Sequence, residues 1–437
     1  MSETKINKGI FLKEVGIKNY RCFKDTIIKN LAIPKGKKGS GLNILIGNNN
    51  SGKTAFLNIF IKLKKDSRIN DEDKYQNKDV EILIIDSSDK KIIIKNKSRS
   101  GIINFEGESK LTIDYFDIVK DNRIWKSNFN GKMDIESYYL NQNNKRDDID
   151  HLLSSVLLEI YNNKELKEKF DEYMKRVIPD FSEWHINSSN KYGSYISYKL
   201  FNGDQLSVDF SVGGGILNLF RIVLSFVIKN KSTPKSIILI DEPEAFLHPI
   251  AQTNLLDLML DISKQKQIIF STHSPYMFKG AIGSGANLII FKRDTKDNIK
   301  VKNAREEGWG IFGEYSPTWG EINWFAYDLP TVEFHNELYG YLQAKAISEN
   351  EKNYYENNFD NWLADKLEIE QNKIWIKLNK NGSTENFNRT LQTYIRNAIH
   401  HPENGHNQKY LNEELKQSII KILDYIKKNE SKNNEKA

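Results

Sequence analysis

Residues 47–54 have the types and the spacing of a loop that binds phosphate. They read Gly-Asn-Asn-Asn-Ser-Gly-Lys-Thr, which matches the pattern G-x4-G-K-[ST]. A short apolar run precedes them and a helical pattern follows, so backbone N–H groups of the loop and the start of the helix can face phosphate oxygens. We expect Lys53 to reach the β- and γ-phosphates and the Thr54 hydroxyl to ligate Mg²⁺. The predicted nucleotide-binding residues here are Gly47, Asn48, Asn49, Asn50, Ser51, Gly52, Lys53 and Thr54.

Two later apolar runs end in polar residues that suit phosphate hydrolysis. Residues 236–240 lead directly into Asp241 and Glu242, which predicts Asp241 beside the metal and Glu242 as the general base that polarises the attacking water. Residues 267–270 lead into a polar cluster with His273 at its tip, which we expect to sense the γ-phosphate. The competing interpretations are a chance Gly-rich turn, an acidic turn and a structural histidine. The occurrence of all three patterns in one chain favours the nucleotide site over each of these interpretations.

A parallel sheet is needed to bring these patterns together. The apolar runs at 236–240, 267–270 and 288–291 predict buried strands, and residues 215–228 and 253–263 predict helices among them. Other patterns are a strand pair in 10–35, β-type runs at 81–85, 91–95 and 111–115, helical spacing over 150–176, and strands near 195–199 and 206–210. After Pro330 the chain looks helical, with 375–378 and 390–399 as core-facing pieces. We therefore expect an α/β fold with an antiparallel β lobe and a helical insertion, followed by a small, mainly helical C-terminal domain.

Composition excludes several classes of protein. The chain has 437 residues, of which 39% are hydrophobic, and a formal net charge of +6, so it can form packed domains. No apolar run approaches the roughly 18 residues of a membrane helix, and the first eight residues lack an apolar signal core. Cys22 is the only cysteine, which excludes an intramolecular disulfide and a zinc–cysteine site. We expect a cytoplasmic protein without membrane contact, whose mild charge permits nucleic acid as a partner but does not require it.

The order of these patterns resembles the ABC-type ATPase heads of the RecF/SMC branch. Residues 17–23 look like the first strand of that branch, residues 211–215 (Ser-Val-Gly-Gly-Gly) look like its signature, and 246–249 (Phe-Leu-His-Pro) look like its D-loop. The resemblance implies ATP and Mg²⁺ as cofactors, and a head-to-head homodimer that sandwiches two ATP molecules. In that dimer the Lys53 of one protomer would face Ser211, Gly213 and Gly214 of the other. Many relatives have a Ser-Gly-Gly-Gln type of signature, and for the Q-loop only Gln142 is a candidate, with a solvated loop glutamine as the competing interpretation.

A second cluster of polar residues lies at 395–404. Arg396 and His401 have the R-x4-H spacing of HEPN ribonucleases, which this segment resembles. In such a site a histidine and an arginine flank a phosphate without a metal, while the 2′-OH attacks. The competing interpretation is structural: positions five apart on a helix point about 140° away from each other, so His400 is better aligned with Arg396. Pro402 also predicts that the helix ends there, where either histidine could cap it.

The combination of the two regions resembles bacterial anti-phage defence ATPases, such as those of the Septu and PARIS systems and the anticodon nucleases PrrC and RloC. We expect an ATPase head over 1–305 with an insertion lobe at about 70–205, an aromatic joint over 306–330, and a C-terminal effector or interaction domain over 331–437. The resemblance implies a nucleotide-gated sensor or scaffold for a separate nuclease or toxin. The alternatives are a RecF-like DNA repair ATPase that clamps DNA, and a scaffold that does not hydrolyse ATP, which Glu242 argues against.

Overall fold

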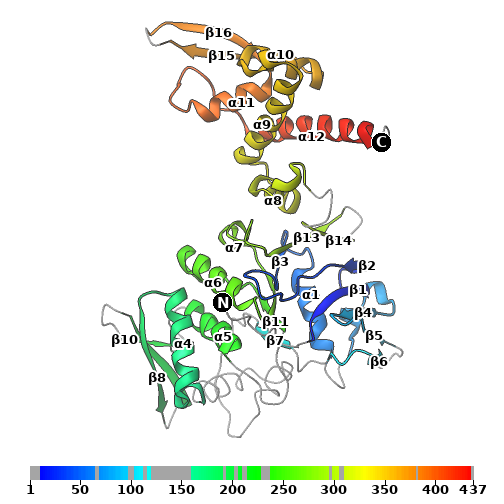
Figure 1. Ribbon diagram of the computed structural model, residues 1–437, viewed down its shortest axis with the longest axis vertical. Helices are drawn as coiled ribbons and strands as arrows, with labels where there is room; N and C mark the ends of the chain where they lie inside the picture. Colours follow the sequence, from blue (N-terminus) through cyan, green and yellow to red (C-terminus); the bar gives the residue numbers. More distant parts are fainter. Residues whose placement is uncertain are drawn as a thin grey trace. The chain divides into compact units, whose positions relative to one another are not determined.

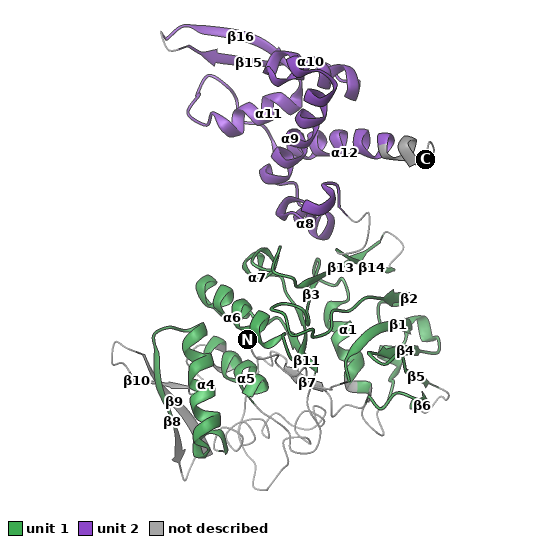
Figure 2. Cartoon of the chain, viewed as in Figure 1, with its two compact units in different colours: residues 1–309 green, residues 310–437 purple. Residues whose placement is uncertain are grey.

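The chain folds into two compact units, residues 1–309 and residues 310–437 (Figure 2). The computed structural model describes residues 10–63, 68–96, 103–111, 116–119, 159–189, 193–200, 205–208, 214–227, 237–294, 298–304, 310–379 and 382–434. Within these residues no helix is both long enough and apolar enough to cross a membrane. Residues 1–309 are called unit 1 and residues 310–437 unit 2.

A six-stranded sheet forms the centre of unit 1, in the order β14-β13-β3-β12-β11-β7 (Figure 1). Its strands are β3 (Leu42–Ile46), β7 (Phe116–Val119), β11 (Ile237–Asp241), β12 (Gln267–Ser271), β13 (Asn287–Arg293) and β14 (Ile299–Asn303). All neighbours pair in parallel except β14, which is antiparallel to β13. Both β3 and β12 are buried along their whole length, which explains why most of their residues are apolar. The three strands predicted from apolar runs are thus confirmed, and β3, β11 and β12 end at the same edge of the sheet.

A second sheet of unit 1 is antiparallel, in the order β2-β1-β4-β5-β6. It comprises β1 (Leu12–Tyr20), β2 (Phe23–Ile28), β4 (Glu81–Asp86), β5 (Lys91–Asn96) and β6 (Ile103–Gly107). Buried residues alternate along β4 and β5 because one face of this lobe packs on the core. The predicted lobe is confirmed, although the expected strand at 111–115 lies almost wholly outside the described residues, and β7 belongs to the central sheet instead.

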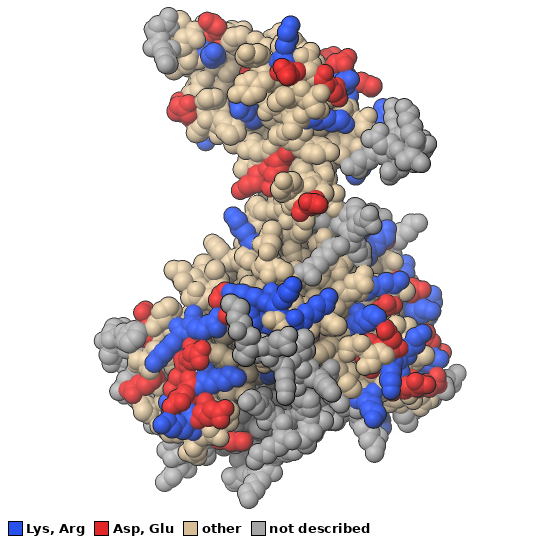
Figure 3. All heavy atoms as spheres, viewed as in Figure 1, with Lys and Arg blue, Asp and Glu red and all other residues tan. Residues whose placement is uncertain are grey.

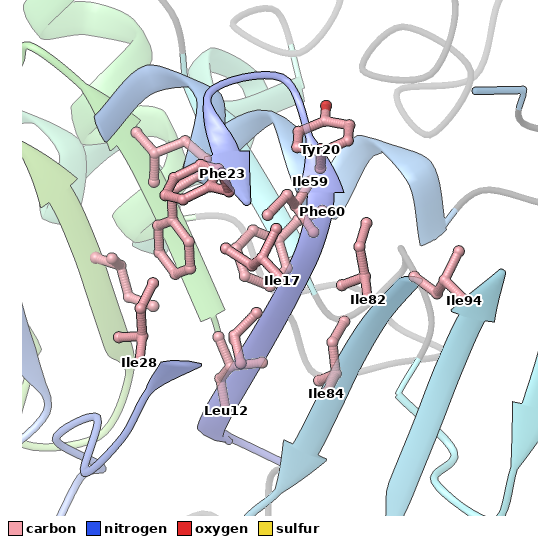
Figure 4. Close-up of a cluster of buried hydrophobic side chains, with 14 of the residues drawn as sticks. Leu12, Ile17, Tyr20, Phe23, Ile28, Ile59, Phe60, Ile82, Ile84 and Ile94 are labelled. Atoms are coloured by element: carbon pink, nitrogen blue, oxygen red, sulfur yellow. The ribbon is translucent and has the colours of Figure 1, made fainter. Parts of the chain in front are cut away.

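Helix α1 (Lys53–Ile59) lies between the two sheets. Figure 4 shows side chains of α1 and of the segment after it, among them Ile59 and Phe60, packed against Ile17 and Ile82 of the lobe. Leu239 and Ile269 of the central sheet belong to the same buried cluster. This core fixes the start of α1, and therefore the loop before it, against both sheets.

Three helices lie on the opposite side of the central sheet from α1 (Figure 1). They are α4 (Lys164–Val177), α5 (Gly214–Val227) and α6 (Pro249–Ile262), followed in sequence by the short α7 (Pro275–Lys279). A third sheet, made of β8 (Phe181–Ser189), β9 (Gly193–Leu200) and β10 (Gln205–Val208), is antiparallel. Trp184 of β8 packs its ring against Phe170 of α4 and Phe220 of α5. This aromatic cluster joins the insertion to the helical layer.

Unit 2 is mainly helical with one hairpin. Its elements are α8 (Trp319–Tyr327), α9 (Val332–Glu349), α10 (Glu356–Leu367), β15 (Lys373–Leu378), β16 (Thr384–Arg389), α11 (Leu391–His400) and α12 (Asn412–Asn434). Their core contains Phe334, Leu338, Phe359, Leu363, Ile395 and Ile419. Within 306–330, the rings of Trp324 and Phe325 lie 6.0 and 6.3 Å from that of Phe334 of α9 in this same unit, in a tilted and an edge-to-face arrangement.

The expectation that the chain stays helical at 375–378 was wrong. Residues 373–378 form β15, which pairs antiparallel with β16. Trp375 is buried while Ile374 and Leu378 are exposed, so the side chains alternate between two faces as in a strand. The polar turn between the strands, which includes Gly382 at φ 82°, favours a hairpin over a continuous helix.

Candidate nucleotide site and C-terminal cluster

The loop at 47–54 joins the end of β3 to α1, in the position predicted for a phosphate-binding loop. Gly47 has φ 146°, and a Cβ atom there would lie 2.1 Å from the carbonyl oxygen of Phe291. Gly52 has φ 98° and is the last residue before α1. Both positions therefore favour glycine because of their positive φ angles. At Gly47 a side chain would also collide with the neighbouring backbone.

Lys53 is held against its own loop. Its side chain is buried, with the residue 5% exposed, and Nζ donates to the carbonyl oxygens of Gly47 at 2.7 Å and Asn48 at 3.0 Å. Burial lowers the pKa of Lys53 to about 8, and the nearby carboxylates of Glu242 and Asp241 oppose part of that shift. The site thus holds a desolvated ammonium group that an anion would stabilise.

Asp241 and Thr54 are in direct contact although they are 187 residues apart. The Thr54 hydroxyl donates to Oδ1 of Asp241 at 3.1 Å, and the Ser271 hydroxyl donates to the same oxygen at 2.5 Å. Ser271 is the last residue of β12, so a neighbouring strand orients the carboxylate. A hydroxyl and a carboxylate this close can share one Mg²⁺, whose other ligands would be phosphate oxygens and water. Within the described part of the chain, no group of three or more His, Cys, Asp or Glu side chains could hold a metal alone.

Glu242 and His273 face each other across the ends of β11 and β12. Oε1 of Glu242 lies 3.7 Å from Nε2 of His273, and both side chains are partly exposed. Burial and the positive charge of Lys53 lower the pKa of His273 to about 4. The imidazole is therefore neutral near pH 7 and can both donate and accept a hydrogen bond.

Glu244 is a site residue that the sequence did not single out as functional. Its carboxylate is buried, and Oε1 accepts hydrogen bonds from the Thr272 hydroxyl and from the backbone N–H groups of His273 and Ser274. Burial raises the pKa of Glu244 above its usual range. The carboxylate links the segment after β11 to the loop after β12.

A cavity of about 730 Å³ adjoins the phosphate loop. Its lining residues are Arg21, Cys22, Glu72, Tyr75, Gln76 and Arg293. The Arg293 guanidinium donates to the carbonyl oxygen of Asn50, which places this side chain at both the cavity and the loop. The two arginines, Tyr75 and the amide of Gln76 offer contacts for the ribose and base of a nucleotide. Of these residues, Arg21 and Cys22 lie in the segment 17–23, which the sequence had singled out as a first strand.

The predicted signature lies only partly within the described residues. Its residues Ser211 and Gly213 lie outside them, as does the Q-loop candidate Gln142. Gly214 is the first residue of α5. A Cβ atom at the next residue, Gly215, would lie 2.5 Å from the carbonyl oxygen of Phe246, so the first turn of α5 packs closely on the segment after β11.

Arg396 and His401 have different partners in unit 2. Arg396 NH1 donates to Oδ1 of Asn397 at 3.0 Å and lies 3.9 Å from Oε2 of Glu356. Helix α11 ends at His400, as Pro402 predicted, and Nδ1 of His401 lies 3.3 Å from Oε1 of Glu403. Burial and the charges of Arg396 and His401 lower the pKa of His400. Within one chain, the structure therefore gives these two residues separate surroundings.

The parallel sheet, the loop at 47–54 and the acidic pair after β11 define the protein as a P-loop nucleotide-binding ATPase. The chain belongs to the family described as "AAA domain, putative AbiEii toxin, Type IV TA system", whose model matches residues 42–278, more than half of the chain. The predicted fold class and ATPase class are thereby confirmed.

The chain is also similar to individual proteins. It is 27% identical over 81 residues to the uncharacterized protein MJECL43 of Methanocaldococcus jannaschii, a match that covers 18% of this chain and 21% of that relative. The chain thus spans about a fifth of the length of that curated relative. Similar solved structures include a Smc head domain with an extended coiled coil bound to the C-terminal domain of ScpA, derived from Pyrococcus furiosus (TM-score 0.46, 15% identity, covering 67% of this chain and 96% of that one). Another is the SMC head domain from Thermotoga maritima (TM-score 0.42, 13% identity, 68% of this chain and all of that one).

Proposed function

We propose that the protein binds ATP with Mg²⁺ and hydrolyses it in unit 1. The observation that carries the proposal is the contact between Thr54 and Asp241, because it joins two distant motifs at one point beside Lys53. Glu242 and His273 lie at the same edge of the sheet. Together these residues offer a phosphate contact, metal ligands and a general base, which are the groups that hydrolysis of a triphosphate requires.

Each side chain has one task in this proposal. Lys53 leaves the loop carbonyls and pairs with the β- and γ-phosphates, while Thr54 and Asp241 hold Mg²⁺, which neutralises charge on the phosphate oxygens when bound. Glu242 accepts a proton from the attacking water, and neutral His273 hydrogen-bonds to the γ-phosphate or that water. Arg21 and Arg293 contact the remainder of the nucleotide from the cavity.

The test compares Lys53→Ala with Glu242→Gln. Lys53→Ala should abolish ATP binding, because the phosphate charge loses its main partner. Glu242→Gln should bind ATP with near wild-type affinity but turn it over at least about 100-fold more slowly, as expected for loss of a general base. Equal ATP turnover in Glu242→Gln and wild type would remove the base assignment.

The proposed assembly is a homodimer of heads that sandwiches ATP, with higher oligomers also compatible. Phe246, Ile250 and Tyr276 are 65%, 64% and 50% exposed, and they lie in the segments that follow β11 and β12 next to the site. A hydrogen bond between Gln252 and Ser274 joins the first turn of α6, which carries Ile250, to the residue that caps α7, which carries Tyr276. Apolar side chains presented beside a nucleotide site suit a second copy of the chain. Light scattering of Glu242→Gln with and without ATP should show an ATP-dependent dimer, and Phe246→Asp should prevent it.

The biological role that we propose is anti-phage defence, in which ATP gates a sensor or scaffold for a nuclease or toxin effector. The description of the matched family as a putative toxin of a toxin–antitoxin system supports this role. Phage plating on cells with wild type, Lys53→Ala or Glu242→Gln tests it. Protection should require both residues, and equal plating in all three strains would contradict the proposal.

We also propose an RNase site around Arg396 and His401, formed between two protomers. The contacts of Arg396 with Asn397 and Glu356 favour it, because they hold the guanidinium in one place while leaving it partly exposed. RNA from infected cells should stay intact with Arg396→Ala/His401→Ala but be cleaved with His406→Ala, a matched change of an exposed histidine. Equal RNA cleavage in the two variants would leave Arg396 and His401 a structural role.

A second candidate, DNA binding in repair or recombination, is favoured by a basic cavity in unit 1. The cavity has a volume of about 610 Å³, and its lining includes Lys13, Lys35, Lys37 and Lys38. Figure 3 shows Lys and Arg side chains gathered on the face of unit 1 in view. Lys13 and Lys38 pair with aspartates, whereas Lys35 and Lys37 are exposed and have no carboxylate partner among the residues described. Lys35→Glu/Lys37→Glu should weaken duplex DNA binding and its salt dependence, and unchanged binding would argue against this candidate.

A further inference from the structure

Glu244 connects two functional segments of unit 1 through three hydrogen bonds. Its Oε1 atom lies 2.7 Å from the Thr272 hydroxyl, 2.8 Å from the backbone nitrogen of His273 and 3.2 Å from that of Ser274. The other oxygen, Oε2, is buried without a hydrogen-bond partner among the described residues. These three donors all come from the loop that carries His273.

Gln252 of α6 makes a second connection between the same segments. Its Nε2 donates to the carbonyl oxygen of Leu247 at 2.8 Å, and its Oε1 accepts from the Ser274 hydroxyl at 2.5 Å. We call Glu244, Gln252 and residues 272–274 the polar bridge. The polar bridge ties the segment after β11 to the loop after β12 at two points.

The backbone that the polar bridge holds is unusual. Glu242 has φ 50° and Phe246 has φ 62°, a left-handed conformation that non-glycine residues adopt only when their surroundings hold them there. Phe246 is exposed, and its carbonyl lies against the first turn of α5.

We propose that Glu244 is a positioning residue that holds His273 opposite Glu242. The inference rests on the proposed ATP hydrolysis. Glu244 acts as a hydrogen-bond acceptor, because Oε1 receives all three bonds. A glutamine at this position keeps that acceptor, and its amide nitrogen replaces the oxygen that has no partner. Glu244→Gln should therefore preserve the positioning, and Glu244→Ala should lose it.

Unit 2 offers a matched control. Glu321 is fully buried, and its carboxylate, like that of Glu244, accepts hydrogen bonds from two backbone N–H groups, those of Ile311 and Thr318, and from one hydroxyl, that of Ser316. Glu321→Ala removes an equivalent set of contacts from the part of the chain without the nucleotide site. It reports what a general loss of stability does to turnover.

The first measurement is the steady-state turnover of ATP by the full chain. We expect Glu244→Ala to lower kcat about tenfold or more while the ATP dissociation constant changes less than about threefold, because misplaced reacting groups slow the chemical step. Glu244→Gln should stay within about threefold of wild type in both quantities, and Glu321→Ala should keep its kcat below its unfolding temperature. The proposal would be overturned if Glu244→Ala kept the wild-type kcat. It would also be overturned if Glu244→Gln or Glu321→Ala lost as much kcat as Glu244→Ala.

The second measurement does not depend on hydrolysis. Hydrogen exchange of a peptide spanning 271–277 should be faster in Glu244→Ala and unchanged in Glu244→Gln, because Oε1 protects the amides of His273 and Ser274. Unchanged exchange in Glu244→Ala would overturn the positioning role. If Glu244→Ala does not fold, Gln252→Ala replaces it, with a smaller increase in exchange and a smaller loss of kcat expected. Failure of the proposed function appears separately, as equal turnover in Glu242→Gln and wild type.

Discussion

The buried ammonium group of Lys53 predicts that ATP affinity falls as the pH rises above 8. The pKa of Lys53 is about 8, because burial disfavours its charged form. Phosphate groups would stabilise that charge, so the pKa of Lys53 in the complex is higher. Binding above pH 8 must therefore take up a proton, and affinity is lost as the pH rises through the pKa of the free protein towards that of the complex.

The size of the effect follows from the fraction of protonated lysine. With a pKa of about 8 in the free protein, about three quarters of the Lys53 side chains are protonated at pH 7.5 and about 3% at pH 9.5. The dissociation constant of ATP should therefore increase about 25-fold over this range. Fluorescence anisotropy of a labelled, non-hydrolysable ATP analogue, at a fixed low Mg²⁺ concentration, measures it.

Lys53→Arg is the control, because guanidinium keeps its charge up to pH 9.5. Its dissociation constant, whatever its value at pH 7.5, should be nearly independent of pH. Thermal unfolding at each pH verifies that the protein remains folded. A wild-type dissociation constant that stays the same between pH 7.5 and 9.5 would refute the reasoning, as would an equally steep dependence in Lys53→Arg.

Two further predictions concern the same loop. Lys53→Met should raise the free energy of unfolding of unit 1 by up to about 3 kcal/mol at pH 7, because the pKa of Lys53 falls from 10.5 in the unfolded chain to about 8 in the folded one. The penalty of burying the charge is complete below pH 8 and fades as the pH rises towards 10.5. The difference in free energy of unfolding between Lys53→Met and wild type, measured by chemical denaturation, should therefore be larger at pH 7 than at pH 10. A difference that does not depend on pH would contradict this prediction. Thr54→Val should raise the Mg²⁺ concentration needed for half-maximal turnover about tenfold or more, whereas Thr54→Ser should not, because serine keeps the hydroxyl beside Asp241. Equal Mg²⁺ dependence in the two variants would exclude Thr54 as a ligand.

The sequence predicted those parts of the fold that depend on local pattern. The strands that end at Asp241 and Ser271 are continuous apolar runs followed by polar residues, and such runs arise from burial in a parallel sheet. The loop at 47–54 could also be predicted from local pattern, because its glycines stand where the backbone has positive φ angles. The end of α11 at His400 followed from Pro402.

Other features could not be predicted because they depend on contacts between distant segments. The pairing of β7 with β11 joins residues more than a hundred positions apart, and nothing in residues 116–119 specifies that neighbour. The role of Glu244 depends on donors from the loop at 272–274, which sequence spacing does not reveal. The hairpin at 373–389 was missed because its apolar alternation is short enough to fit a helix as well as a strand.

The single cysteine lies where a spectroscopic probe would be most informative. Cys22 lines the cavity next to the phosphate loop, and a Cβ atom at Gly52 would lie 3.2 Å from its sulfur. Because the chain contains no other thiol, a maleimide dye or a nitroxide would attach there without any engineered background. Half-burial and the raised pKa of this thiol slow the labelling reaction, so mildly alkaline buffer is appropriate. A single labelling step on the wild-type chain would therefore place a reporter beside the proposed nucleotide site.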